Sequence, residues 1–138
     1  MEFIYIFLGG ALGAVLRYLI LLCFKVYPAD VIGVFGVNML GCFILGFFSY
    51  IGIKRNNILG DDLKKFFTVG FAGGFTTFSA FSHPVLEMFL MHHYLYAFLN
   101  MFISVIAGLI SVSWGMNCGY YAMLYLIRTK RISLKESR

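Results

Sequence analysis

The stretch GFAGGFTTFSAFS, residues 70–82, decides the fold of this chain. It lies near the middle of an apolar run from Phe66 to Met91, which is long enough to cross a bilayer core about 30 Å thick. Glycines and hydroxyl side chains interrupt the run, and irregular backbone at this depth is tolerated only where protein or a water-filled cavity satisfies its polar groups. We therefore expect a membrane-spanning segment that is broken in its middle, and the break predicts a functional site.

Three further apolar runs are long enough to be membrane spans. They extend from Phe3 to Phe24, from Val31 to Ile53 and from Tyr94 to Ile127. With 138 residues, 61% of them hydrophobic, and a mean hydropathy of +0.87, the chain has more apolar surface than a small soluble domain could bury. The sequence predicts an all-α integral membrane protein of four transmembrane helices, with one domain over residues 1–127 and a frayed basic tail over residues 128–138.

Basic residues are concentrated on one side of this topology. The N-terminus, the second loop and the tail share that side, and every lysine and arginine except Lys25 and Arg17 falls there. Because basic loops stay in the cytoplasm, both termini are predicted to be cytoplasmic. The same placement accounts for the net charge of +5, so we expect no nucleic-acid binding. The first run has no basic start and no small-residue cleavage site, and we expect it to be retained as a span.

Polar residues inside the other spans are candidates for an ion pathway. Arg17 is costly within a bilayer unless it reaches the headgroups or faces protein and water, so it either snorkels or forms a positively charged vestibule wall. Asn38 can form a helix-to-helix hydrogen bond or line a pathway, and the sequence leaves both open. Asn100 and Ser104 lie one turn apart in the fourth span and extend a polar face.

Phe78 and Phe81 are three residues apart, so they would project from one face of the helix that follows the break. The edge of an aromatic ring carries the positive part of its quadrupole. Ring edges, together with donors from Thr77, Ser79 or Asn38, could hold an anion without a full positive charge that would trap it. Packing in an ordinary core is the alternative for both phenylalanines.

Taken together, these motifs resemble the Fluc, or CrcB, family of small fluoride channels over nearly the whole chain. The first motif is GGALGA at residues 9–14 followed by Arg17-Tyr18, the second is Val37-Asn38 followed by Gly41, and the third is GGFTTFSAF at residues 73–81. The third motif is highly specific, and the three occur in the order expected of the family.

The resemblance implies a dimer of two four-helix subunits inserted in opposite orientations in the cell membrane. Two pathways along the subunit interface would give passive, fluoride-specific export and protection from fluoride toxicity, with no enzyme activity. A structural sodium ion, which is not transported, would be held by the backbone carbonyls of Gly73 and Thr76. Arg17 would contribute a basic vestibule. The expected pathway residues are Asn38, Thr77, Phe78, Ser79, Phe81, Asn100 and Ser104.

The chain departs from the family pattern at several points. Ala80 stands where a threonine is common, and Pro84 stands about where relatives often carry an acidic residue, with Glu87 a turn later. The strong bias of basic residues also disfavours a subunit that inserts both ways. A homodimer and a heterodimer with an oppositely oriented relative therefore both remain open.

Three other functions compete with a channel. A coupled small-molecule exporter of the small multidrug type would need a membrane-embedded carboxylate, and the nearest is Glu87 at the end of the third span. A membrane enzyme or haem carrier could use His83, His92 and His93, for which a solvated position near one membrane face is the alternative. A structural assembly subunit would need only the small-residue packing of the spans.

Overall fold

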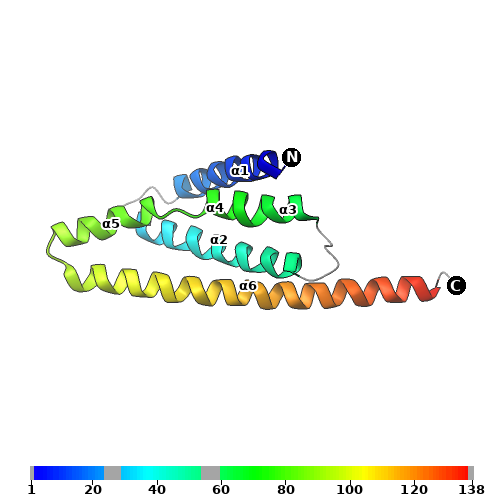
Figure 1. The fold of residues 1–138 in the computed structure, drawn as a ribbon. Helices are drawn as coiled ribbons and strands as arrows, with labels where there is room; N and C mark the ends of the chain where they lie inside the picture. The colour runs from blue at the N-terminus through cyan, green and yellow to red at the C-terminus, as the bar shows by residue number, and fades with distance from the viewer. Residues whose placement is uncertain (1, 24–28, 54–59, 137–138) are drawn as a thin grey trace.

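The computed structural model describes residues 2–23, 29–53 and 60–136, and all regular secondary structure in these ranges is helical (Figure 1). The elements are α1 (Glu2–Cys23), α2 (Ala29–Ile53), α3 (Asp61–Lys65), the π-helix η1 (Phe66–Phe71), α4 (Ala72–Phe75), α5 (Ser79–Leu90) and α6 (Tyr94–Glu136). The expected all-α fold is confirmed for the described residues.

Three of the described helices are long and apolar enough to cross a membrane. They cover Glu2–Cys23, Val31–Gly52 and Tyr94–Arg128, and they correspond to the first, second and fourth predicted spans. The third predicted span is instead assembled from the shorter pieces η1, α4 and α5, which follow one another along the molecule in Figure 1. The expected break in the third helix is therefore confirmed.

The break occupies residues 76–78, between α4 and α5. Thr76 closes α4, because its amide and its hydroxyl both donate to the carbonyl of Ala72 at 2.9 Å. Its backbone is then extended, with φ −75° and ψ 155°, so the chain leaves the helix. The hydroxyl of Thr77 accepts a hydrogen bond from the amide of Ala80 at 3.2 Å and so satisfies one of the free amides in the first turn of α5. The low helix propensity of Gly73 and Gly74 favours a stop at this point.

A seam of glycines places α1 directly against the third span. A Cβ atom added to Gly13 would meet the carbonyl oxygen of Phe71, and one added to Gly74 would meet the carbonyl oxygen of Gly10. The two backbones are therefore in contact with no side chain between them, as in other membrane helix pairs built on small residues. This close approach brings the C-terminal half of α1, which carries Arg17, beside the break.

Replacing Gly74 by alanine is expected to destabilise the fold. The new methyl group would lie only 2.9 Å from the Cα atom of Gly10, and both partners are backbone, so neither can rotate away. Overpacking of this kind costs about 1–3 kcal/mol. The matched control is Gly36→Ala, because a Cβ at Gly36 has nothing within 4 Å. Thermal unfolding in detergent, followed by size-exclusion chromatography, should show a lower midpoint for Gly74→Ala alone, and equal midpoints would contradict the seam.

The last helix, α6, packs along α2 and holds it closely. The hydroxyl of Ser111 donates to the carbonyl of Met39 at 2.6 Å across the pair. A Cβ added to Gly46 would meet the carbonyl oxygen of Val112, and one added to Gly115 would meet that of Phe43. The backbones of the two helices are thus in close contact along their length.

At its C-terminal end α6 extends past the other helices (Figure 1). Its 43 residues give a length of about 65 Å, roughly twice the thickness of a hydrocarbon core. The helix continues to Glu136, past the predicted end of the span at Ile127. The division into a domain over residues 1–127 and a tail over residues 128–138 stays a prediction. Lys25, Lys54 and Arg55, on which the orientation argument partly depends, lie outside the described residues, as do the side chains from residue 129 onward.

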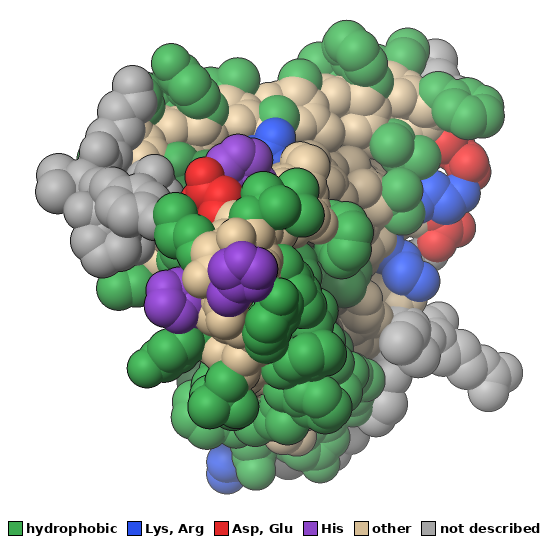
Figure 2. Space-filling model, turned by 90° about the vertical axis from the view of Figure 1, so that its left-hand side faces the viewer, with side chains coloured by type: hydrophobic (Ala, Val, Ile, Leu, Met, Phe, Trp, Pro, Cys, Tyr) green, Lys and Arg blue, Asp and Glu red, His purple; other side chains and the backbone are tan. Residues whose placement is uncertain are grey.

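The outer surface is strongly apolar. On α1 Phe3 is 85% exposed, and on α6 Trp114 is 68% exposed. Figure 2 looks onto the end where α5 turns into α6, and hydrophobic side chains cover much of the visible surface there. Apolar surface of this extent fits lipid as its solvent and not water. The chain is therefore a multi-pass membrane protein.

Candidate functional site

A cavity of about 510 Å³ lies between α2, the broken third span and α6, and we call it the groove. Most of its lining is apolar. Its polar lining side chains are Asn38, Thr68, Thr76, Thr77, Asn100 and Ser104. Gly73, Phe78, Phe81 and Pro84 also border it. Among the described residues, no charged side chain lines the groove, so any ion in it would interact with dipoles and ring edges alone.

Asn38 of α2 holds the break in place through two hydrogen bonds. Its Oδ1 atom accepts the backbone amide of Thr77 at 2.8 Å, and its Nδ2 atom donates to the carbonyl of Thr77 at 3.1 Å. In an unbroken helix the amide of Thr77 would donate to Gly73, so Asn38 replaces a lost intrahelical bond. Of the two interpretations that the sequence left open, the helix-to-helix hydrogen bond is confirmed. Asn38 also borders the groove, and its role in a pathway stays a prediction.

Arg17 supports the break from the other neighbouring helix. Its Nη1 atom donates to the carbonyl of Thr76 at 3.2 Å, and the side chain is half-buried. A guanidinium is less costly inside a membrane protein when it pairs with a backbone carbonyl, so this bond is the partner that the sequence analysis required. Arg17 does not line the groove. A vestibule role for Arg17 stays a prediction.

Phe78 and Phe81 stand together at the break, as their spacing predicts. Their ring centroids are 5.8 Å apart with an interplanar angle of 45°, and both rings border the groove. Phe78 is 80% exposed, although it lies at the middle of a membrane span. Burial in a core is therefore the wrong interpretation for Phe78 within a single chain.

The hydroxyl residues of the break divide between two environments. Thr77 is only 8% exposed and borders the groove, and its hydroxyl lies 3.2 Å from the hydroxyl of Ser79. Ser79 is exposed and does not line the groove. In a single chain, only Thr77 of this pair faces the same space as Asn38.

Asn100 and Ser104 of α6 form the opposite wall. Ser104 Oγ donates to Asn100 Oδ1 at 3.3 Å, and both side chains border the groove. They also border a smaller cavity of about 230 Å³ beside Phe35. The groove thus brings together, from three spans, every expected pathway residue except Ser79.

Backbone carbonyls at the break suit a hard cation. The amide of Thr77 donates to Asn38 and leaves the carbonyl of Gly73 without that helical donor. Gly73 is exposed and borders the groove. The carbonyl of Thr76 has one lone pair engaged by Arg17 and a second available. Unwound carbonyls of this kind coordinate sodium in membrane transporters, so the residues fit the expected ion.

The sequence analysis assigned no site role to Thr68 or Gly41, and both border the groove. Thr68 borders it from η1, and its hydroxyl donates to the carbonyl of Lys64 at 2.9 Å. The spacing of Thr68 to Ala72 and Thr76 could have signalled a shared face, but a π-helix lies between them. Gly41 also borders the groove, and a Cβ there would meet the methyl group of Thr76. Because Gly41 has no Cβ atom, the break can lie directly against α2.

The histidines lie away from the groove. His83 is 3.8 Å from Glu87, and His92 Nδ1 is 2.8 Å from the hydroxyl of Tyr94. Neither these residues nor His93 borders the groove. In Figure 2 histidines gather at the end where α5 turns into α6. All three histidines are exposed, and a solvated position near one membrane face stays a prediction.

Comparisons with known proteins agree with the motifs. Residues 4–116 match the model of the family described as CrcB-like protein, Camphor Resistance (CrcB). The chain is 37% identical over 124 residues to the fluoride-specific ion channel FluC of Helicobacter pylori strain Shi470, covering 83% of this chain and 92% of that protein. It is 38% identical over 113 residues to FluC of Azobacteroides pseudotrichonymphae, covering 78% and 87%. The resemblance drawn from the sequence is confirmed, and the chain belongs to the CrcB-like family.

Proposed function

We propose that this chain is a fluoride-specific ion channel that exports fluoride passively and protects the cell from fluoride toxicity. The observation that carries the proposal is the uncharged groove at the break, bordered by amide donors and by the rings of Phe78 and Phe81. The relatives named above carry the same function in their names. Such a channel performs no covalent chemistry and is not an enzyme.

The mechanism is stepwise replacement of the hydration shell. Fluoride is small and tightly hydrated, so entering an apolar groove is costly unless donors take the place of water. Asn38 and Asn100 offer amide hydrogens from facing walls, and the ring edges of Phe78 and Phe81 offer weaker positive contacts between them. The hydroxyls of Thr77 and Ser104 border the same route, whereas Ser79 lies outside the groove of its own chain. Because no lining group carries a full charge, the ion is not trapped.

A second subunit completes the pathway in this proposal. Phe78 is 80% exposed at membrane depth and the groove is open, so a single chain does not enclose a route for an ion. We infer that a subunit of opposite orientation covers this face and that two pathways run along the interface. The partner is either a second copy or an oppositely oriented relative, and the bias of basic residues favours a fixed orientation for this chain.

A structural sodium ion belongs to the same proposal. The carbonyls of Gly73 and Thr76 would hold it, together with the matching carbonyls of the second subunit. Bound there, the ion would neutralise backbone dipoles at the subunit contact and would not be transported. Arg17 shares the Thr76 carbonyl and contributes positive charge beside the break.

A coupled exporter gains no support from the site. Glu87, the carboxylate within α5 of the broken span, lies beside His83 and does not border the groove. Among the described residues, no carboxylate or histidine that could exchange protons with a substrate borders the groove.

Fluoride efflux from proteoliposomes tests the proposal. Vesicles loaded with fluoride and containing the purified protein should release it within seconds when a potassium ionophore removes the charge imbalance, as measured by a fluoride electrode. Chloride-loaded vesicles should release nothing comparable, and an internal pH dye should report no proton flux linked to fluoride. Release of chloride at the same rate, or fluoride release that depends on a proton gradient, would contradict a passive fluoride-specific channel.

A further inference from the structure

The side chains that line the groove must distinguish anions from cations without a full charge of their own. No charged side chain lines it among the described residues. An asparagine amide is ambivalent, because its oxygen attracts cations and its nitrogen hydrogens attract anions. Two asparagines border the groove, so the direction in which each amide is fixed decides the sign of the ion that the wall favours.

At Asn38 the backbone fixes that direction. A peptide amide can only donate and a peptide carbonyl can only accept, so the two bonds to Thr77 allow a single orientation of the side-chain amide. Oδ1 is held by the amide of Thr77 at 2.8 Å. Nδ2 uses one hydrogen on the carbonyl of Thr77, and the second hydrogen has no acceptor among the described residues. Asn38 therefore offers the groove a donor, while its acceptor is occupied.

At Asn100 the oxygen of the side-chain amide is engaged by a neighbouring side chain. Ser104, one turn later on α6, donates its hydroxyl hydrogen to Asn100 Oδ1 at 3.3 Å. The nitrogen of Asn100 is left with both hydrogens for the groove and the adjoining smaller cavity. If the hydroxyl were removed, the amide of Asn100 could rotate and present its oxygen instead.

We propose that locked amides make the groove selective for anions: the Thr77 peptide orients Asn38, and the hydroxyl of Ser104 orients Asn100, so that both walls present N–H donors. Ser104 is then a positioning residue that acts through Asn100. The inference rests on the proposed fluoride channel. It adds which groups of the groove make the permeant ion an anion and not a cation.

The test is the selectivity of Ser104→Ala in a planar bilayer with a potassium fluoride gradient. The wild type should give a current that reverses at the equilibrium potential of fluoride. In Ser104→Ala the reversal potential should shift toward that of potassium, and fluoride flux should fall roughly fivefold to tenfold, the factor that one ordinary hydrogen bond corresponds to. Ser104→Thr, which keeps a hydroxyl, should restore the wild-type reversal potential.

The matched control is Ser113→Ala on the same helix. The hydroxyl of Ser113 donates to the carbonyl of Leu109, and the residue is exposed and does not border the groove. Its removal should leave reversal potential and flux unchanged. If Ser104→Ala lowers the flux but still reverses at the fluoride potential, or behaves like Ser113→Ala, the orienting role is wrong while the channel proposal stands. A wild type that carries no fluoride current would overturn both.

Discussion

Replacing Phe78 or Phe81 by isoleucine is expected to abolish fluoride flux while leaving the assembly intact. Isoleucine keeps an apolar side chain but has no quadrupole, so the positive ring edges that the proposal assigns to the groove are lost. Fluoride would then cross this part of the groove with nothing to replace its water, and the cost of several kcal/mol corresponds to a loss of at least about a hundredfold. Fluoride-electrode recordings from proteoliposomes measure the flux, and size-exclusion chromatography verifies the assembly.

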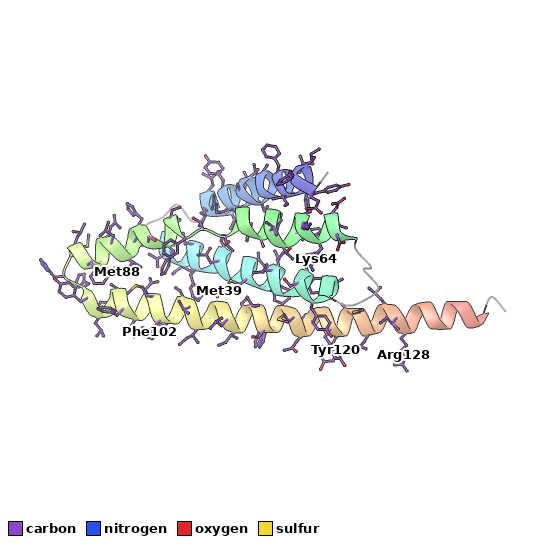
Figure 3. The ribbon with its side chains drawn as sticks, viewed as in Figure 1. Met39, Lys64, Met88, Phe102, Tyr120 and Arg128 are labelled. Atoms are coloured by element: carbon purple, nitrogen blue, oxygen red, sulfur yellow. The ribbon has the colours of Figure 1, made fainter. Side chains whose placement is uncertain are left out.

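Phe102→Ile is the matched control for this change. Phe102 is 66% exposed, does not border the groove, and lies on the side of α6 that faces away from α2 (Figure 3). Its substitution should leave the flux within about twofold of the wild type. If the Phe78 and Phe81 variants retained wild-type flux, their rings would have no part in conduction.

Replacing Asn38 by aspartate is expected to have the second large effect. One carboxylate oxygen can still accept the amide of Thr77, but the other would face the carbonyl of Thr77 and repel it. The new negative charge would also oppose an anion in the groove. Two unit charges 4 Å apart at an effective dielectric constant of 20 interact by about 4 kcal/mol, so flux should fall roughly a thousandfold.

Asn117→Asp is the matched control. It distinguishes the effect of a negative charge in the groove on fluoride flux from the effect of a new negative charge elsewhere in the protein. Asn117 is an exposed residue of α6 outside the groove. Asn117→Asp should conduct fluoride normally in the proteoliposome assay, and Asn38→Asp should not. Equal fluxes from the two variants would show that the hydrogen bonds between Asn38 and Thr77 do not matter for conduction. They would also show that a negative charge at the groove does not impede the ion.

The sequence predicted the position of the break because local chemistry determines it. Gly73 and Gly74 weaken the helix, and Thr76 and Thr77 have hydroxyls that can close one helix and cap the next. It did not predict the π-helix at Phe66–Phe71, because no local signal distinguishes one extra residue in a turn from an ordinary α-helix. Thr68 lies within this π-helix and borders the groove together with Ala72 and Thr76.

The sequence also did not predict hydrogen-bond partners that lie far apart along the chain. Arg17 needed a partner, but the Thr76 carbonyl lies 59 residues away and is available only because the third span is broken. Asn38 was a candidate pathway residue, yet its bonds to the Thr77 backbone depend on the same break. Ser79 was expected beside the other donors, and the turn at the break places it outside the groove of its own chain.

Current through a single purified channel in a planar bilayer tests the central claim most directly. With sodium fluoride in unequal concentrations on the two sides and a pH difference imposed across the membrane, the broken third span and its uncharged groove predict a steady current. That current should reverse at the fluoride equilibrium potential and ignore the pH difference. No current, or a reversal potential that follows protons or chloride, would contradict the claim.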